Sequence, residues 1–300
     1  MKRLIVIVGP TAVGKTALAI QLAKHFNTEI ISADSRQIFK ELEIGTAKPS
    51  KEELNEVPHH FINTKSVFEK YDAGQYGRDA LELVNKLFQK YDMLVLVGGS
   101  GLYVKALLEG FDDMPDADEN LRNEIVSNYR SNGLEWLKSE VQNADPEFFE
   151  TVDQQNPQRL MRALELVKTS GKKINELRSK KKIELDFHVV KIGLELPREE
   201  LYERINLRMD QMIELGLFEE AERFHQHKDL NALQTVGYRE IFDFLEGKYD
   251  KTEAIRLLKQ NSRHYAKRQL TWFKRDESIH WFHPRETEKI IQLLESYINT

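Results

Sequence analysis

The chain has 300 residues, a formal net charge of −5 at pH 7 and no cysteine, which excludes a disulfide framework, thiolate chemistry and cysteine-bound zinc. Hydrophobic residues make up 40% of it, and no run approaches the roughly 18 to 20 apolar residues of a membrane span. We therefore expect a cytoplasmic protein without membrane contact. Nothing is typical of a coiled coil, so we expect a monomer. The net charge does not favour nucleic-acid binding, although a local basic patch is enough to bind RNA.

The first part of the chain predicts strands that alternate with helices. Residues 3–8 are continuously apolar, as in a strand buried on both faces, and residues 17–26 have helical periodicity. Residues 29–34 predict a second strand that ends at an aspartate. Helical spacing returns over 76–92, and 93–97 predict a third buried strand that runs into a glycine-rich turn. This alternation predicts a parallel sheet with helices on both faces.

The segment 116–182 is polar and helical, without a convincing strand. In it, Asn156 is placed as an N-cap, Pro157 as the first helical residue and Gly171 just past the helix end.

The last part of the chain returns to the α/β pattern. Residues 187–196 predict a strand, long helices are expected from 198 to 229 and from 252 to about 275, and 279–283 predict a short last strand before a helical C-terminus. We therefore predict an α/β core with a parallel sheet flanked by helices, formed by residues 1–115 and 183–300, and an inserted all-helical subdomain, residues 116–182.

The sequence GPTAVGKT at residues 9–16 has the Gly-x-x-x-x-Gly-Lys-Thr spacing of a phosphate-binding loop. Its glycines let backbone N–H groups converge on an anion, Lys15 adds a positive charge, and the Thr16 hydroxyl can bind magnesium. The helix that follows contributes its N-terminal partial charge. A buried strand before the loop and a helix after it make a chance match improbable.

The machinery for nucleotide hydrolysis looks incomplete. A nucleotide hydrolase usually carries a magnesium-binding aspartate after a second strand, but the strand at 93–97 ends in Gly98, Gly99 and Ser100. The other carboxylate at a strand end is Asp34. The loop should therefore hold a phosphorylated substrate. A small-molecule kinase that uses ATP, or an RNA-binding module that grips backbone phosphate, remain alternatives at this point.

Six motifs occur in one order: GPTAVGKT, SADSRQIFKELEIGTAKP, LVGGSGLYVKALLEG, NPQRLMRALE, VGYRE and YAKRQLTWF. Together they resemble the tRNA dimethylallyltransferases, also called isopentenyl-tRNA transferases, over most of residues 3–275. The phosphate loop alone is shared by many proteins, whereas IGTAKP after DSRQ, and AKRQLTWF, are far narrower signals.

The resemblance implies that the enzyme moves a dimethylallyl group from dimethylallyl diphosphate to N6 of an adenosine beside the tRNA anticodon. Diphosphate is the leaving group, so neither water activation nor phosphoryl transfer is needed, which accounts for the missing aspartate. The partners implied are tRNA, through its anticodon loop, and dimethylallyl diphosphate, with Mg²⁺ as cofactor. The residues implied to bind the diphosphate are Gly9, Pro10, Thr11, Ala12, Val13, Gly14, Lys15 and Thr16, with Thr16 binding the metal.

The catalytic residues that we expect are Asp34, Lys15, Thr16, Ser100 and Arg223. A carboxylate beside the loop suits the base that removes the proton from the attacking amine, and Asp34 is our choice. The alternatives for Asp34 are binding a water ligand of magnesium or capping the next helix. Ser100, where the family commonly has threonine, is expected to hydrogen-bond the substrate, or else only to form a turn. Arg223 is expected to reach the diphosphate, or else to pair with Glu219 or Glu220.

The acceptor adenosine must leave its stack to enter a pocket. Arg122 and the segments DSRQ and QRLMR resemble tRNA-contacting positions, and a solvated helical face is the alternative for QRLMR. The residues implied to contact tRNA are Asp34, Ser35, Arg36, Gln37, Ser100, Arg122, Gln158, Arg159, Leu160, Met161 and Arg162.

Two basic stretches also favour an RNA partner. The first is residues 172–182, which alone are more typical of a solvated run. The second is a stripe on the helix from Thr252, formed by Arg256, Lys259, Arg263, Lys267 and Lys274. Another stripe on that helix is predicted to face the core, together with Trp281: Ile255, Leu258, Tyr265 and Trp272.

Overall fold

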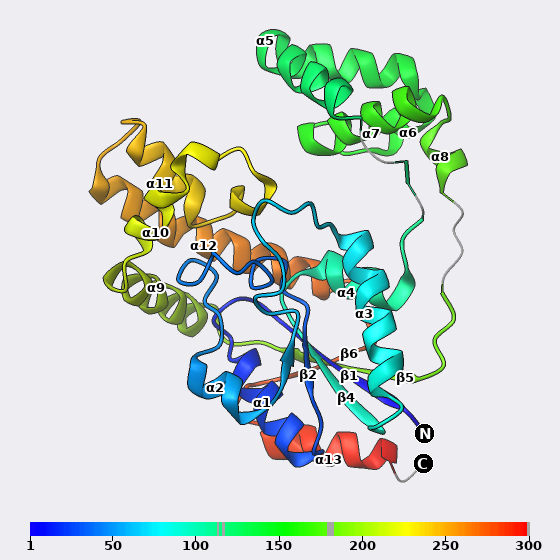
Figure 1. The fold of residues 1–300 in the computed structure, drawn as a ribbon, viewed down its shortest axis with the longest axis vertical. Helices are drawn as coiled ribbons and strands as arrows, with labels where there is room; N and C mark the ends of the chain where they lie inside the picture. The colour runs from blue at the N-terminus through cyan, green and yellow to red at the C-terminus, as the bar shows by residue number, and fades with distance from the viewer. Residues whose placement is uncertain (113, 116–117, 179–182, 299–300) are drawn as a thin grey trace. The chain divides into compact units, whose positions relative to one another are not determined.

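The computed structural model describes residues 1–112, 114–115, 118–178 and 183–298. The chain forms two compact units, one made of Met1–Glu109 and Glu184–Thr300 and the other of Gly110–Ile183 (Figure 1). The predicted boundary positions 116 and 182 lie outside the described residues.

The first unit is built on a parallel sheet with the strand order β3-β2-β4-β1-β5-β6 among the described residues. β1 lies between β4 and β5 and is buried along its whole length. The apolar runs of the sequence thus form the central strands, as predicted. The strands are β1 (Arg3–Val8), β2 (Ile30–Ser32), β3 (His59–His60), β4 (Met93–Val97), β5 (His188–Leu194) and β6 (Ile279–Phe282).

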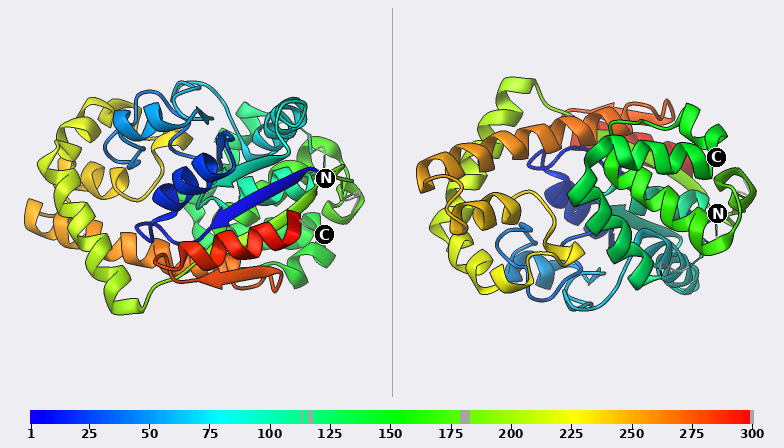
Figure 2. Two further views of the ribbon diagram at one scale, coloured as in Figure 1. Left: turned by 90° about the horizontal axis from the view of Figure 1, so that it is seen from below. Right: turned by 90° about the horizontal axis from the view of Figure 1, so that it is seen from above.

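Alternate side chains of β1 pack into two hydrophobic layers, one on each face of the sheet. Ile5 and Ile7 pack against α1 (Lys15–His25), α9 (Arg198–Glu214) and α13 (Thr287–Ile298). The opposite layer is completed by the helices α3 (Ala73–Leu87) and α4 (Gly101–Glu109) (Figures 1 and 2).

A third hydrophobic cluster joins residues 38–44 to the later helices. These helices are α9, α10 (Leu217–Arg223), α11 (Tyr238–Leu245) and α12 (Lys251–Phe273). The helical stretch predicted over 198–229 is divided at Gly216, where φ is 100° and a new helix begins. A 3-10 turn at His225–His227 follows α10.

The second unit is all-helical within its described residues, as predicted. Asn156 caps α7 through its side chain, Pro157 opens the helix, and Gly171 ends it with φ of 68°. The core of this unit includes Leu137 and Leu160. Its helices are α5 (Glu119–Ala144), α6 (Pro146–Thr151), α7 (Pro157–Ser170) and α8 (Ile174–Leu177).

Several short elements were not predicted. α2 (Lys51–Glu56) begins with a capping box between Ser50 and Glu53. His59 and His60 form the edge strand β3. No described helix combines the length and apolar composition needed to cross a membrane.

Replacing Gly98 with alanine should strongly destabilise the first unit. A Cβ at Gly98 would lie 2.1 Å from the carbonyl oxygen of Ala33, which belongs to the buried backbone after β2. We expect a loss of roughly 3 kcal/mol in the free energy of unfolding, measured by urea titration. Gly247→Ala is the control, because φ is 75° there but the space is open; its cost should be roughly 1 kcal/mol. Equal losses would contradict the close approach.

Candidate active site

A cavity of about 490 Å³ lies at the carboxyl ends of β1, β2 and β4. A parallel sheet brings the loops after its strands to one edge, where α/β proteins commonly bind ligands. These loops supply Lys15, Asp34 and Gly98, and the helices α9 and α12 add Arg208 and Gln269. Five of the six motifs, all except NPQRLMRALE, therefore supply residues to the lining of one cavity.

The loop between β1 and α1 is wound tightly by residues with positive φ. The φ angles are 146° at Gly9, 63° at Ala12 and 106° at Gly14. At Gly9 an added Cβ would lie 2.6 Å from the carbonyl oxygen of Leu194, so the loop leaves β1 in contact with β5. Gly14 caps α1, whose first residues line the cavity. The partial positive charge of this helix end favours an anion there.

Lys15 is held by the loop itself. Its Nζ donates a hydrogen bond to the carbonyl oxygen of Pro10 over 2.7 Å. Burial lowers the pKa of the Lys15 ammonium to about 8; the Asp34 carboxylate acts in the opposite direction, and Arg208 adds to the lowering. The structure therefore keeps a half-buried cation whose charge a bound anion would stabilise.

Gln269 on α12 connects the phosphate loop to the turn after β4. Its Oε1 accepts a hydrogen bond from the N–H of Thr11 over 2.8 Å, and its Nε2 donates to the carbonyl oxygen of Gly99 over 2.9 Å. This role was not predicted, although AKRQ was one of the motifs that carried the resemblance. It also uses the Thr11 N–H, one of the groups expected to bind diphosphate.

Asp34 lies two residues beyond the end of β2, in a turn rather than at the strand end. Its Oδ1 accepts hydrogen bonds from the N–H groups of Arg36 (2.9 Å) and Gln37 (3.3 Å). No hydrogen bond to Oδ2 is found among the described residues. Asp34 thus stabilises the DSRQ turn with one oxygen, and the other is available to a ligand in the cavity.

Ser100 is tied to the DSRQ turn. Its Oγ accepts a hydrogen bond from the N–H of Ser35 over 2.9 Å and donates to the Ser35 hydroxyl over 3.1 Å. The cavity wall includes Gly98 and Gly99. These bonds make Ser100 part of the turn, and its expected hydrogen bond to the substrate stays a prediction.

The helix α9 contributes two arginines to the cavity lining: Arg204, which pairs with Glu200 over 3.1 Å, and Arg208. Nη2 of Arg208 donates to the carbonyl oxygen of Ala47 over 3.2 Å, and burial lowers the pKa of its guanidinium. Arg223, the residue predicted for this role, is exposed at the end of α10 and is absent from the described lining of the cavity. Arg208 lies one helical turn after the buried Ile205 and on the same face of α9. This spacing in the sequence could have indicated that Arg208 points toward the interior.

The sequence matches the family model described as IPP transferase over residues 37–276. The chain belongs to the IPP transferase family. It is 51% identical to a tRNA dimethylallyltransferase of Cytophaga hutchinsonii, with 98% of this chain and 97% of the relative covered. A tRNA dimethylallyltransferase of Flavobacterium johnsoniae is 50% identical, with 94% and 93% covered.

Solved structures of the IPP transferase family have the same fold. The full-length tRNA isopentenylpyrophosphate transferase of Bacillus halodurans is 37% identical, with a TM-score of 0.73 and coverage of 99% of this chain and 96% of that one. A eukaryotic dimethylallyltransferase described as acting on tRNA has a TM-score of 0.78 at 26% identity, with 100% and 80% covered. The resemblance stated from the motifs is confirmed.

The QRLMR segment lies in the second unit of this IPP transferase, at the start of α7. Gln158 and Arg159 are exposed. Leu160 is 0% exposed and belongs to the core of its unit, so the prediction that it contacts tRNA is wrong. Met161 packs partly buried against that core. Arg162 donates to Glu165 over 2.9 Å, within one helical turn.

Arg122, on α5, lies 3.9 Å from the other oxygen of the buried Glu165. Arg122 and Arg162 therefore share one carboxylate. The basic run at 172–182 is described only as far as Arg178.

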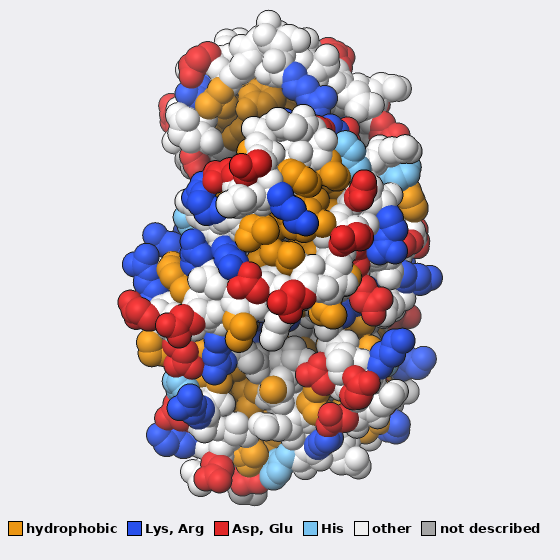
Figure 3. All heavy atoms as spheres, turned by 90° about the vertical axis from the view of Figure 1, so that its left-hand side faces the viewer, with side chains coloured by type: hydrophobic (Ala, Val, Ile, Leu, Met, Phe, Trp, Pro, Cys, Tyr) orange, Lys and Arg blue, Asp and Glu red, His pale blue; other side chains and the backbone are white. Residues whose placement is uncertain are grey.

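The basic stripe of α12 is largely paired within the protein. This pairing favours a structural role of the stripe over the predicted contact with RNA phosphates. On the face of the molecule shown in Figure 3, Lys and Arg side chains are interspersed with Asp and Glu. The pairs are Arg256 with Glu253, Lys259 with Asp210, Arg263 with Asn206 and Lys274 with Glu195.

The predicted core stripe of α12 is corrected at two positions. Trp272 is 39% exposed, with its Nε1 close to Gly101. Tyr265 lines the cavity. Leu258 is fully buried and Trp281 packs against the core, as predicted.

Proposed function

We propose that this protein transfers the dimethylallyl group of dimethylallyl diphosphate to N6 of an adenosine adjacent to the tRNA anticodon and releases diphosphate. In this IPP transferase one cavity contains both the phosphate loop with Lys15 and the Asp34 carboxylate, and this observation carries the proposal. The relatives' names favour prenyl transfer over the small-molecule kinase. We also propose that the enzyme acts as a monomer in the cytoplasm.

The electrostatic task is to stabilise the departing diphosphate. Lys15, Arg208 and the N-terminus of α1 line the cavity and supply positive charge in a site largely removed from water, where such charge acts strongly. Oxygen donors fit Mg²⁺, which is usually held by one or two protein oxygens together with phosphate oxygens and water. Thr16 would hold it, and the ion would neutralise charge on the leaving group.

The chemical task at the acceptor is to remove a proton. The N6 amine of adenine is a weak nucleophile because its lone pair is delocalised into the ring, and it becomes acidic as its new bond to carbon forms. Asp34 accepts this proton through the oxygen that the DSRQ turn leaves available. Arg36 and Gln37, next to it in the cavity wall, bind the target nucleotide.

The remaining tRNA contacts are proposed for Ser35, Ser100, Met161 and the exposed or half-buried polar residues of the second unit. Arg122 and Arg162 contact RNA with guanidinium groups whose charge Glu165 partly balances. The polar residues concerned are Arg122, Gln158, Arg159 and Arg162.

The assignment is tested by incubating the protein with labelled dimethylallyl diphosphate and unmodified tRNA, with and without Mg²⁺. We expect label to enter tRNA only with Mg²⁺. An ATP-hydrolysis assay runs in parallel. ATP turnover without transfer of label would replace the proposal by the kinase alternative.

Asp34→Asn should remove most of the transfer activity while leaving tRNA affinity within a few-fold of wild type, because the amide oxygen can still accept the bonds of the DSRQ turn but the amide cannot take the proton. Loss of a general base typically lowers kcat by roughly 10²- to 10⁴-fold. Single-turnover transfer and filter binding measure the two quantities separately. A near-normal kcat would exclude Asp34 as the base.

Arg208→Ala should weaken binding of magnesium diphosphate, whereas Arg223→Ala should not. Loss of one charge-assisted contact costs about 1.5–3 kcal/mol, so we expect the Kd of Arg208→Ala to rise by roughly 10- to 150-fold. Isothermal titration calorimetry gives both values. Equal effects of the two variants would restore Arg223 to the site.

The contribution of Lys15 to diphosphate binding should disappear at alkaline pH. Without a ligand, the pKa of Lys15 is about 8. Only the charged form attracts the anion, so above this pH the lysine must take up a proton when the diphosphate binds, and binding weakens. We measure the ratio of the Kd of Lys15→Gln to that of wild type, in which titration of the ligand cancels. The ratio should be constant below about pH 8 and fall up to tenfold per pH unit above it. A ratio that is constant up to about pH 10 would contradict this role.

A further inference from the structure

The turn at residues 43–47 is held by a buried carboxylate that no step of the proposed reaction uses. This group is Glu220 on α10, which is 1% exposed. Its two oxygens accept hydrogen bonds from the N–H groups of residues 43–45 over 2.8 to 3.0 Å. The hydroxyl of Tyr238, the first residue of α11, donates a fourth bond to Oε1 over 2.7 Å.

These four donors explain how a carboxylate can be buried here. Burying a charge is costly unless hydrogen bonds replace its water, and N–H and O–H donors satisfy both oxygens of Glu220. An apolar side chain at this position would leave the three backbone N–H groups of the turn and the Tyr238 hydroxyl without an acceptor. The position of the turn that Glu220 binds suggests why a carboxylate is present.

The carbonyl groups of the same turn hold two side chains of the cavity. The Gln37 amide nitrogen donates to the carbonyl oxygens of Thr46 (3.3 Å) and Ala47 (3.1 Å). The Ala47 oxygen also accepts the bond from Nη2 of Arg208 over 3.2 Å. With both amide hydrogens used, Gln37 is left with Oε1, an acceptor, for a donor group of the target base.

Tyr238 limits the movement of the turn by direct packing. A Cβ added at Gly45 would lie 2.6 Å from ring atoms of Tyr238, so the backbone of the turn rests against the phenol. Tyr238 is itself fully buried.

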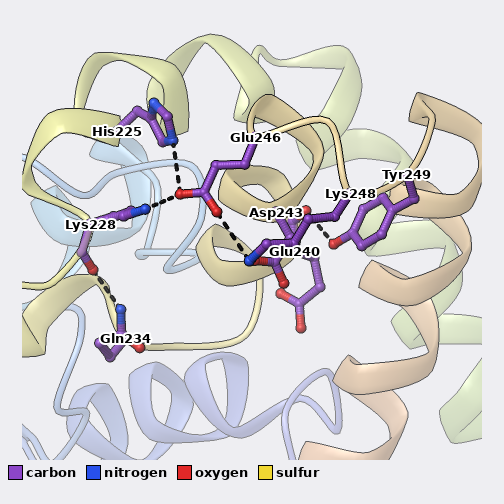
Figure 4. Close-up of polar contacts among 8 residues, drawn as sticks. All are labelled: His225, Lys228, Gln234, Glu240, Asp243, Glu246, Lys248 and Tyr249. Atoms are coloured by element: carbon purple, nitrogen blue, oxygen red, sulfur yellow. Dashed lines mark hydrogen bonds and ion pairs between the residues drawn. The ribbon is translucent and has the colours of Figure 1, made fainter. Parts of the chain in front are cut away.

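The helical corner that carries Glu220 and Tyr238 is fixed by further contacts. Figure 4 shows the Glu246 carboxylate between the side chains of His225, Lys228 and Lys248. These contacts join the 3-10 turn after α10, the helix that carries Glu220, to the end of α11, which begins at Tyr238.

We propose that Glu220 and Tyr238 are positioning residues for dimethylallyl transfer, which act by fixing the 43–47 turn and, through its carbonyls, the Gln37 amide and the Arg208 guanidinium. The inference rests on the proposed function. The helical corner of α10 and α11 thereby sets the geometry at both the acceptor base and the leaving group.

The test uses isosteric variants of the full chain. Glu220→Gln replaces one accepting oxygen by an NH₂ group that faces an N–H or O–H donor. Tyr238→Phe keeps the ring and removes only the hydroxyl. The matched controls are Glu219→Gln, at the exposed neighbouring position of α10, and Tyr249→Phe, whose hydroxyl donates to the Glu240 carbonyl oxygen in the same helical region.

We expect Glu220→Gln to raise KM for both tRNA and the allylic donor by about tenfold, because a buried donor of the turn then faces an NH₂ group. Tyr238→Phe should raise both by about threefold, because the carboxylate loses one of its four donors. Both controls should stay within about twofold of wild type. Thermal unfolding reports the folded fraction. If Glu220→Gln does not fold, Tyr238→Phe is used in all the measurements.

Double-mutant cycles separate positioning from general stability. The effect of Glu220→Gln on the tRNA KM should vanish in a Gln37→Ala background, and its effect on the donor KM should vanish in an Arg208→Ala background. Additive effects, or a loss of kcat that follows only the folded fraction, would overturn the proposal.

A binding measurement distinguishes failure of this inference from failure of the proposed function. The Kd of magnesium diphosphate, measured by calorimetry without tRNA, should rise about tenfold in Glu220→Gln relative to Glu219→Gln. An unchanged Kd would overturn the positioning of Arg208. Absence of transfer by the wild-type enzyme would instead overturn the proposed function.

Discussion

Positive charge withdrawn from water is the constraint on which the cavity depends. Lys15 and Arg208 are both half-buried, and loss of water around them lowers the pKa of each. Each cation donates to one backbone carbonyl oxygen, that of Pro10 or of Ala47. A carbonyl carries only a partial charge, so a diphosphate is a stronger partner for both groups. The loops that follow separate strands are shaped to keep these cations in one place.

Local sequence signals predicted the elements that build this site. The apolar run of β1, the glycines of the phosphate loop and the Asn156 and Gly171 caps each depend on neighbouring residues, and the structure has them where the pattern placed them. The break at Gly216 was missed because helical periodicity continues on both sides of it, while the backbone there has positive φ.

Contacts between distant segments were not predictable in the same way. Gln269 and Glu220 act by bonding backbone groups more than a hundred residues away, which no local pattern reveals. Leu160 and Trp272 were misplaced for a related reason. A motif does not separate residues that contact a ligand from residues that pack in the core. Leu160, predicted to contact tRNA, is buried, and Trp272, predicted to face the core, is 39% exposed.

The turn after β4 has no room for the magnesium-binding carboxylate of a nucleotide hydrolase. A hydrolase would place its magnesium-binding carboxylate near this position. Here a Cβ at Gly98 would meet the Ala33 carbonyl oxygen at 2.1 Å, and a Cβ at Gly99 would meet Nε2 of Gln269 at 2.3 Å. The space for an acidic side chain is thus filled by backbone and by Gln269. Among the described residues, two carboxylates line the cavity, Glu53 and Asp34. Glu53 closes the capping box with Ser50, whereas Asp34 holds the DSRQ turn with one oxygen and keeps the other available, which suits the proton transfer proposed for it.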